Sequence, residues 1–327
     1  MLLLNTGVLT YESIKEWKEQ NISTFKNDLI GLNSFHDQIM RKVLKVAIEK
    51  LNKGEPPCDF SWFVTGSGGR FEQGFISDQD HGMIYMEDSE ECHLYFKALG
   101  EELADGLAFV GYPYCKGYIM SSNPLWCKSF QGWKEQLLAW MESESWGAIR
   151  YLQIFYDARV IEGEEPYIKQ LKTVIYDYQL KHPKLLKRFL ANIMHIKNII
   201  GPLGQILVER YGTYQGCIDL KYSAFVPYVN AIRILAIKEG IYETSTLARI
   251  SRLTQQKEYG QLLQNCEQNF ELLLKYRLSL YKVNDYSDTH YLRIAGLEKE
   301  KKKQIKQILK TGVRIHDEVI ELIEKGC

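Results

Sequence analysis

The chain has 327 residues, enough to bury a sizeable core as two domains or as one large domain. Apolar residues make up 45% and charged residues 25%, a balance that excludes intrinsic disorder and low-complexity structure. Lysine plus arginine and aspartate plus glutamate each number 41. No net charge therefore favours nucleic acid, anionic membranes or acidic partners, and a local site must hold any bound polyanion.

The N-terminal residues lack the basic region and the cleavage site of a signal peptide, and no apolar run reaches the roughly 18 residues of a membrane span. We therefore expect a cytoplasmic protein without membrane partners. The 7 cysteines are scattered and form no Cys-x-x-Cys pair, which favours reduced thiols over a zinc site.

In chain order, residues 11–51 come first, with apolar side chains at spacings near the helical period. A break at Gly31–Ser34 predicts a helical hairpin in this region. The turn residues Gly54–Pro57 end it.

A mixed segment follows. Its β-rich runs predict strands at residues 61–65, 79–86 and 117–121. An amphipathic stretch between the last two runs predicts a helix over 89–110, with Ser89 as its N-cap.

The second half of the chain has long helical periodicity, which predicts an all-helical bundle. The helices are expected at residues 167–181, 185–210, 224–239 and 258–281. The charged segment Glu298–Lys303 alternates in sign and leads into an apolar stripe, which favours a solvated helix face over a nucleic-acid-binding tail. Together the elements predict an α+β protein divided into residues 1–55, 56–165 and 166–327.

The stretch that carries chemistry lies between the first two predicted strands. The turn Gly66–Gly69 allows positive φ and close approach of backbone N–H groups to an anion. Ser67 adds a hydroxyl donor, and Arg70 adds a planar cation that suits a phosphate. These residues predict a phosphate-binding turn.

Two carboxylates follow this turn. Asp78 and Asp80, preceded by Ser77, are two residues apart at a predicted strand end, so both leave one face and can chelate Mg²⁺. Two such ions about 3.5–4 Å apart would bridge the phosphates of a nucleotide. His81 falls on the opposite face, which favours a packed or surface histidine over a metal ligand.

Each half of this pattern has a structural alternative, since the glycines also fit a tight strand-to-helix turn and the aspartates a solvated strand start. Their coincidence favours a metal–nucleotide site, because two carboxylates facing a phosphate-binding turn repel each other without a cation. The spacing excludes a P-loop and, with Phe71, the Gly-x-Gly-x-x-Gly fingerprint.

The Gly-Ser turn followed by Asp-x-Asp resembles the signature of the DNA polymerase β-type nucleotidyltransferase superfamily. The longer run Gly66–Gln73, with Ser77–Asp80 and Ile84-Tyr85, is similar to a nucleotidyltransferase family related to the protein-PII uridylyltransferases and often fused to CBS domains in bacteria. Further similar segments are Gly111–Trp126, Phe155–Arg159, Asp219–Lys221, Ala231–Gly240 and Thr246–Arg249.

The resemblance implies a polymerase β-like domain over residues 56–165 and a helical substrate-binding domain over 166–327. It also implies transfer of a nucleoside monophosphate from an NTP to an acceptor, with Asp78 and Asp80 as catalytic residues that hold Mg²⁺ or Mn²⁺. The implied nucleotide-binding residues are Gly66, Ser67, Arg70 and Ser77.

Three further residues, Glu72, Asp157 and Arg159, match the same pattern. We interpret Glu72 as the partner of a buried arginine. Active superfamily members usually add a third carboxylate on a later strand, and the predicted strand at 117–121 carries none. Asp157 or Glu72 would have to substitute, although Asp157 beside Arg159 is equally typical of a structural ion pair.

Two hypotheses follow. The first is a Mg²⁺-dependent, uridylyltransferase- or adenylyltransferase-like enzyme that modifies a hydroxyl of a protein, such as a PII-like signalling protein, or of a small molecule, without a nucleic-acid template. The second is a nucleotide-sensing or interaction module without transfer activity, which the missing third acid favours. The sequence leaves the NTP, the acceptor and the oligomeric state open.

Overall fold

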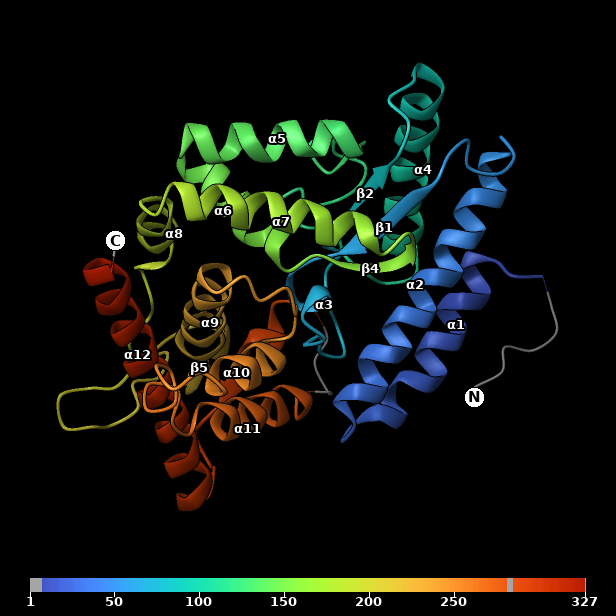
Figure 1. The fold of residues 1–327 in the computed structure, drawn as a ribbon. Coiled ribbons are helices and arrows are strands. Elements are labelled where there is room, and N and C mark those ends of the chain that lie inside the picture. The colour runs from blue at the N-terminus through green and yellow to red at the C-terminus, as the bar shows by residue number, and fades with distance from the viewer. Residues whose placement is uncertain (1–7, 281–284, 327) are drawn as a thin grey trace. The chain divides into compact units, whose positions relative to one another are not determined.

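The structure is a computed structural model that describes residues 8–280 and 285–326. The chain divides into two compact units, Met1–Ala139 with Asp157–Val174, and Trp140–Tyr156 with Ile175–Cys327. The first unit is mixed α/β and the second is mainly helical, which confirms the predicted α+β class (Figure 1). The division into three domains at residues 55 and 165 stays a prediction.

A four-stranded mixed sheet forms the centre of the first unit. Its strands are β1 (Phe60–Val64), β2 (His81–Tyr85), β3 (Cys127–Ser129) and β4 (Arg159–Gly163), in the order β3-β2-β1-β4. The central strand β1 is antiparallel to both neighbours, whereas β2 and β3 are parallel. Val64 pairs with His81 on one side and with Arg159 on the other. The end of β1 and the starts of β2 and β4 therefore meet at one end of the sheet.

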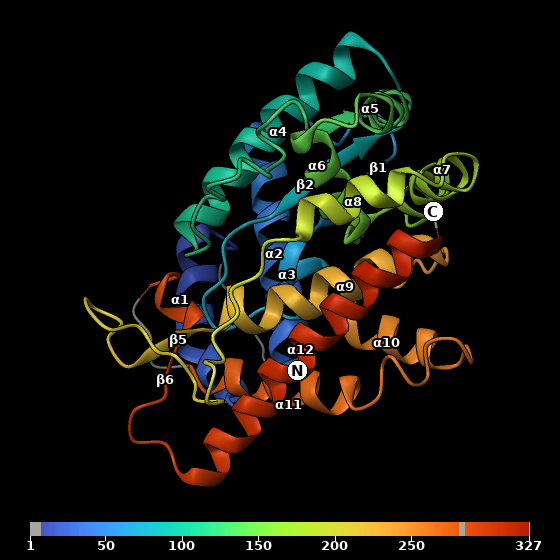
Figure 2. The ribbon, with the colours of Figure 1, turned by 90° about the vertical axis from the view of Figure 1, so that its left-hand side faces the viewer.

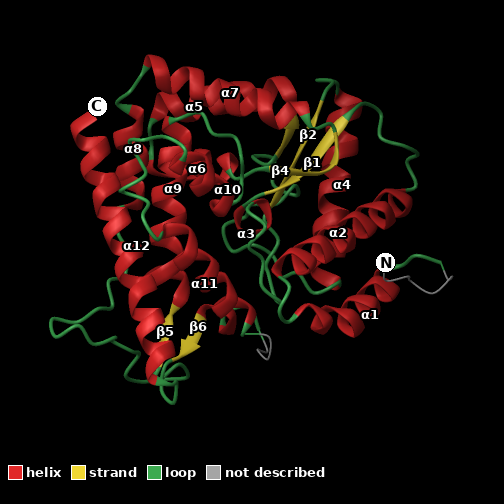
Figure 3. Ribbon diagram, turned by 60° about the horizontal axis from the view of Figure 1, so that its bottom comes forward, coloured by secondary structure: helices red, strands yellow, loops and turns green. Residues whose placement is uncertain are grey.

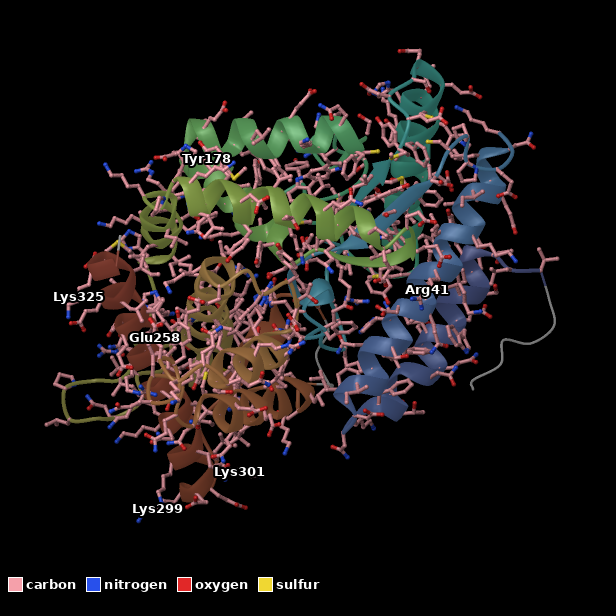
Figure 4. All side chains as sticks on the ribbon, viewed as in Figure 1. Arg41, Tyr178, Glu258, Lys299, Lys301 and Lys325 are labelled. Carbon is pink, nitrogen blue, oxygen red and sulfur yellow. The ribbon has the colours of Figure 1, made fainter. Side chains whose placement is uncertain are left out.

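Helices α1 (Tyr11–Asn21), α2 (Leu29–Leu51) and α4 (Glu90–Phe109) pack together and bury one apolar cluster with the sheet (Figure 2). Ser89 caps α4, as predicted, by accepting a hydrogen bond from the Cys92 N–H. Arg41 of α2, labelled in Figure 4, donates to the Ile161 carbonyl and so ties the helix to the edge strand β4.

The predicted break at Gly31–Ser34 is wrong, because these residues lie inside α2. The hairpin instead turns through the 3₁₀ segment η1 (Ile22–Phe25) and Asp28, whose carboxylate caps α2 by accepting from the Gly31 N–H. A Cβ at Gly31 would stand 2.2 Å from the Asp28 Oδ2 atom. The glycine therefore makes room for a helix cap and does not end a helix.

The predicted strand at 117–121 is also wrong. These residues form turns in which the Tyr118 N–H donates to the Cys115 carbonyl, and Tyr118 has a φ of 56°. The segment lies beside the start of β2, because the His81 N–H donates to the Ile119 carbonyl at 3.0 Å. The outer strands of the sheet are β3 and β4, which the periodicity did not predict.

The second unit is a helical bundle with a two-stranded sheet (Figure 3). Helix α9 (Val226–Lys238) is buried over most of its length and packs against α10 (Thr246–Thr254) and α12 (Lys299–Gly326). The other helices of this unit are α6 (Trp146–Tyr156), α8 (Leu185–Ile193) and α11 (Cys266–Leu278). Its strands are β5 (Cys217–Asp219) and β6 (Tyr291–Arg293).

Five short or boundary elements complete the fold. Helices α5 (Phe130–Ser143) and α7 (Pro166–Lys181) each contain a boundary between the units. The short elements are α3 (Gly66–Gly69), the π-helical η2 (Lys221–Phe225) and the 3₁₀ segment η3 (Asp288–His290). The predicted helices at 167–181 and 224–239 correspond closely to α7 and α9.

Two predicted helices are too long. The helix expected over 185–210 ends at Ile193, and the chain beyond it folds back so that the Leu207 N–H donates to the Ile199 carbonyl. Gly204 has a φ of 73°, which a helix interior does not accommodate. The helix expected over 258–281 begins only at Cys266, and residue 281 lies outside the described residues.

The charged segment before the last apolar stripe is exposed, as predicted. Lys299 and Lys301, labelled in Figure 4, extend outward from the first turn of α12. Within residues 8–280 and 285–326, no helix is long and apolar enough to cross a membrane.

Candidate functional site

The sheet end described above brings the glycine turn against the second aspartate. The Thr65 N–H donates to the Asp80 carbonyl at 2.8 Å, directly before the turn. Gly66 has a φ of 55°, and a Cβ built on it would stand 2.4 Å from the Asp80 Oδ2 atom. Only a glycine therefore lets the backbone of the turn approach the Asp80 carboxylate this closely.

Two serines lie within the same turn region. The Ser67 and Ser77 hydroxyl oxygens are 3.4 Å apart, and Ser77 is buried. The Glu72 N–H donates to the Ser67 carbonyl, which closes the loop behind the turn. At Gly69, an added Cβ would stand 2.0 Å from the Asp157 carbonyl oxygen, so this glycine packs directly on the chain that precedes β4.

The two aspartates lie just before β2 and not within it, which corrects the predicted start of that strand. They are partly exposed and alternate with the buried residues Ser77, Gln79 and His81, so they still share one side of an extended segment. Gln79 anchors this segment by donating from its side chain to the Ala104 and Tyr112 carbonyls, both at 3.1 Å.

His81 is packed inside the unit, in agreement with one of its two predicted roles. Its Nε2 is 2.9 Å from the Gln79 Oε1, and its Nδ1 is 3.0 Å from the Ser121 hydroxyl. Burial lowers the pKa of His81 to about 3. The imidazole is therefore a neutral core group.

Asp78 and Asp80 lie close to Cys115, a residue that the sequence reasoning missed. One ligand atom from each of the three side chains lies within 4.8 Å of the other two. Backbone hydrogen bonds hold the Cys115 segment in place, from the Gln79 N–H to the Pro113 carbonyl and from the His81 N–H to the Ile119 carbonyl. Burial, followed by the charge and the hydrogen-bonding contact of Asp80, raises the pKa of the Cys115 thiol to about 12.

Arg70 lies between two buried carboxylates. Its Nε donates to Glu72 at 2.8 Å and its Nη1 to Asp157 at 2.7 Å, and the side chain is 11% exposed. Burial alone lowers the pKa of Arg70, but the two carboxylates outweigh burial and raise it. The interpretation of Glu72 as the partner of a buried arginine agrees with this geometry, whereas the predicted contact of Arg70 with phosphate stays a prediction.

Arg159 does not pair with its neighbour Asp157 through any of its described hydrogen bonds. It forms a bidentate ion pair with Asp37 of α2, at 2.8 and 2.9 Å, and donates to the Gly68 carbonyl at 2.9 Å. The Phe71 ring stacks on its guanidinium at 3.7 Å. Arg159 therefore joins α2, the glycine turn and β4.

A cavity of about 770 Å³ adjoins the three-residue cluster within the same unit. Cys115 lies on its wall, with Glu101 and Asp105 of α4. The other lining residues are Ala104, Tyr114, Lys116, Tyr118, Met120 and Ser122. The cavity therefore brings charged and aromatic side chains next to the aspartates.

The residues present fit a divalent cation. Two carboxylates within 4.8 Å of each other need a counter-charge, and the close approach of Gly66 keeps the Asp80 carboxylate in place. The third donor is a sulfur, which is a poor ligand for Mg²⁺ and a good one for softer divalent metals.

The described residues thus combine a small mixed sheet, whose end sets a glycine turn against two carboxylates, with a second, mainly helical unit. Residues 29–146 match the family model described as putative nucleotidyltransferase DUF294. Residues 183–320 match the model described as putative nucleotidyltransferase substrate binding domain. The two matches support a nucleotidyltransferase family for this chain and suggest nucleoside monophosphate transfer in general. No curated protein matches the chain.

Proposed function

We propose that this protein transfers a nucleoside monophosphate from an NTP to a hydroxyl group of a protein or small-molecule acceptor, with a divalent cation at Asp78 and Asp80. One observation carries the proposal: the glycine turn and the Asp80 carboxylate face each other so closely that a Cβ on Gly66 would stand 2.4 Å from Oδ2. A triphosphate on the turn would therefore lie within reach of a cation on the aspartates.

The chain's own residues would bind and orient the triphosphate. Because the first N–H groups of a helix lack an acceptor within it, those at the start of the Gly66–Gly69 turn would donate to phosphate oxygens. The Ser67 and Ser77 hydroxyls, 3.4 Å apart, would add two donors. Arg70, held by Glu72 and Asp157, would support the turn from behind.

A bound cation would supply charge neutralisation at the phosphates and polarise the phosphorus that is attacked. The acceptor hydroxyl would attack the α-phosphorus and release its proton to water, and pyrophosphate would leave. The cavity beside Cys115 offers space for a substrate group next to this centre. We propose that residues 183–320 position the acceptor, since their matching family model carries the description of a substrate binding domain.

Label transfer tests the proposal. The protein is incubated with each of the four α-labelled NTPs and Mg²⁺ or Mn²⁺, alone and with candidate acceptors that include a PII-like protein. We expect cation-dependent labelling that the double variant Asp78→Asn/Asp80→Asn lowers by about 10³-fold, which corresponds to about 4 kcal/mol of transition-state stabilisation. The matched control is Glu87→Gln, which changes an exposed carboxylate outside the site.

The second candidate is a nucleotide-sensing module. One observation favours it: Glu72 and Asp157, the two carboxylates that could replace a third catalytic acid, both bind Arg70. NTP binding that depends on Asp78 and Asp80, without label on any acceptor, would establish the sensor and overturn the transferase.

A further inference from the structure

The three-residue cluster has a donor set that the nucleotidyltransferase proposal does not require. Asp78 and Asp80 contribute oxygens, but Cys115 contributes a sulfur within 4.8 Å of both. Cys115 comes from a segment 35 residues farther along the chain than Asp80. One backbone hydrogen bond on each side of Cys115, at Pro113 and at Ile119, fixes that segment to residues 79–81. The sulfur is therefore held at the carboxylates by the fold.

Burial and Asp80 favour the protonated Cys115 thiol in the metal-free protein, but one backbone contact of the sulfur suits a metal-bound thiolate. The Gly117 N–H donates to the Cys115 Sγ at 3.3 Å, a contact that stabilises negative charge on sulfur. The side chain is 8% exposed, so the sulfur is shielded from bulk water while it also lines the cavity. The position of the sulfur within 4.8 Å of two carboxylates is the observation that brings one sulfur and two oxygen donors to a single centre.

We propose that Cys115 is the third ligand of this centre and that the centre binds a borderline divalent cation, Zn²⁺ in particular, more tightly than it binds Mg²⁺. Mg²⁺ takes oxygen ligands almost exclusively, whereas Zn²⁺ binds both thiolate and carboxylate, with three protein ligands in sites that keep a position open. On binding, the S–H bond of Cys115 breaks, its proton passes to the buffer, and a sulfur–metal bond forms without any change of oxidation state.

This preference for Zn²⁺ rests on the proposed function, because it concerns the cation site of the same centre. It predicts that Zn²⁺ regulates the reaction. Zn²⁺ at the centre would compete with Mg²⁺, so a small concentration of Zn²⁺ would change or block a Mg²⁺-dependent reaction. The test measures metal binding without turnover, so it can be read even if the protein transfers no nucleotide.

The test uses Co²⁺ as a spectroscopic stand-in for Zn²⁺ on the reduced, metal-free full chain. We expect one equivalent of Co²⁺ to produce a near-ultraviolet sulfur-to-cobalt charge-transfer band. Zn²⁺ should displace it stoichiometrically and a large excess of Mg²⁺ should not. Cys115→Ser should abolish the band and weaken Zn²⁺ binding by about 100-fold or more, since even outer-shell changes cost 10–100-fold.

Cys58→Ser is the matched control, because Cys58 and Cys92 form a close pair of thiols outside the cluster, with their sulfurs 3.2 Å apart, that could itself bind Co²⁺. That variant should keep the band. A band that survives in Cys115→Ser, or that disappears in Cys58→Ser, would overturn the inference. So would Co²⁺ binding by calorimetry without any charge-transfer band.

Cadmium-113 NMR of the unmodified protein provides a measurement that does not depend on folding of a variant. One bound sulfur moves the cadmium resonance far downfield of an all-oxygen site, and Asp78→Asn should then weaken binding while the resonance stays downfield. An all-oxygen shift would contradict the inference. Mg²⁺-dependent label transfer that Zn²⁺ and Cys115→Ser leave unchanged would overturn it while the transferase proposal stands.

Discussion

Two groups of carboxylates lie at one end of the same sheet and differ in what surrounds them. Glu72 and Asp157 have side-chain exposures of 2% and 1% and both bind Arg70. Asp78 and Asp80 are partly exposed and lie beside the Cys115 thiol and a cavity. The first group is compensated by a buried cation of the chain itself. The second is arranged so that a cation from solution can reach it.

The difference separates residues with a structural role from residues to which we assign metal binding. Arg70 with its two carboxylates, Gly69 packed on Asp157, and Arg159 paired with Asp37 all fix the glycine turn to the strands around it. None of these contacts needs a ligand. Asp78 and Asp80 lie beside the turn and Cys115, and we assign the bound cation to them. Substitutions in the two groups should therefore change stability in opposite directions.

The largest expected effect is on stability, from Arg70→Met. The variant leaves Glu72 and Asp157 buried without their shared cation, which should lower the free energy of unfolding by about 3–5 kcal/mol. Urea unfolding followed by circular dichroism measures it. Lys325→Met is the control, because Lys325 is 72% exposed and its partner Glu321 is 64% exposed, and such a pair contributes about 0–1 kcal/mol. Equal losses in the two variants would remove the distinction between the groups.

A second prediction tests the packing that holds the turn. Gly69→Ala places a Cβ where the Asp157 carbonyl oxygen lies 2.0 Å away, so backbone must move and the free energy of unfolding should fall by about 1–3 kcal/mol or more. Gly147→Ala, in α6, meets nothing within 4 Å and should be neutral or stabilising by up to about 1 kcal/mol. Thermal unfolding compares the two. An unchanged Gly69→Ala variant would mean that the turn is not packed on the chain before β4.

Acid pH should lower the stability of the protein through buried histidines, and His36 is one of them. Its Nδ1 lies 2.7 Å from the Tyr112 hydroxyl and its Nε2 lies 3.0 Å from the Gly74 carbonyl. Burial, with the nearby Lys18, lowers the pKa of His36 to about 3. Between about pH 6.5 and that value the unfolded chain binds a proton that the folded chain does not, so stability falls as pH falls, by up to about 1.4 kcal/mol per pH unit.

Urea titrations at several pH values measure this slope. His36→Gln should make it shallower by about 1 kcal/mol per pH unit, and His182→Gln, at an exposed histidine, should leave it unchanged. His81, whose pKa burial also lowers to about 3, contributes equally to all three proteins and cancels. A slope that does not respond to His36→Gln would contradict this assignment.

The two groups also differ in how far sequence could predict them. Gly66, Asp78 and Asp80 lie within 15 residues of one another, so their chemistry and spacing indicated a site before any fold was known. Glu72, two residues from Arg70, was interpreted from the sequence as the partner of a buried arginine. The second partner of Arg70 and the partner of Arg159 lie 87 and 122 residues away, at Asp157 and Asp37, and local spacing carries no signal for such pairs.

Cys115 illustrates the same limit more sharply. It is one of 7 scattered cysteines, and its role depends on a turn-rich segment that hydrogen-bonds beside β2 without joining the sheet. The β-rich composition of residues 117–121 predicted a strand, but the tertiary position of the segment outweighed that preference. Helix ends were misplaced for a related reason, since Gly31 makes room for a cap inside a helix whereas Gly204 lies in a turn beyond the end of α8, and the sequence does not distinguish the two.

The smallest expected effect is that of Asp78→Asn, which should raise the free energy of unfolding where Arg70→Met lowers it. Asp78→Asn removes a charge that lies within 4.8 Å of Asp80, and in metal-free protein this should raise the free energy of unfolding by about 1 kcal/mol, the repulsion expected in a water-like dielectric. Added Zn²⁺ or Mn²⁺ should reverse the order, because only the unmodified protein gains stability from the bound cation. Thermal unfolding with chelator and with each metal measures both halves. A variant that is less stable than the unmodified protein both with chelator and with metal would give Asp78 the same structural role as Glu72 and Asp157.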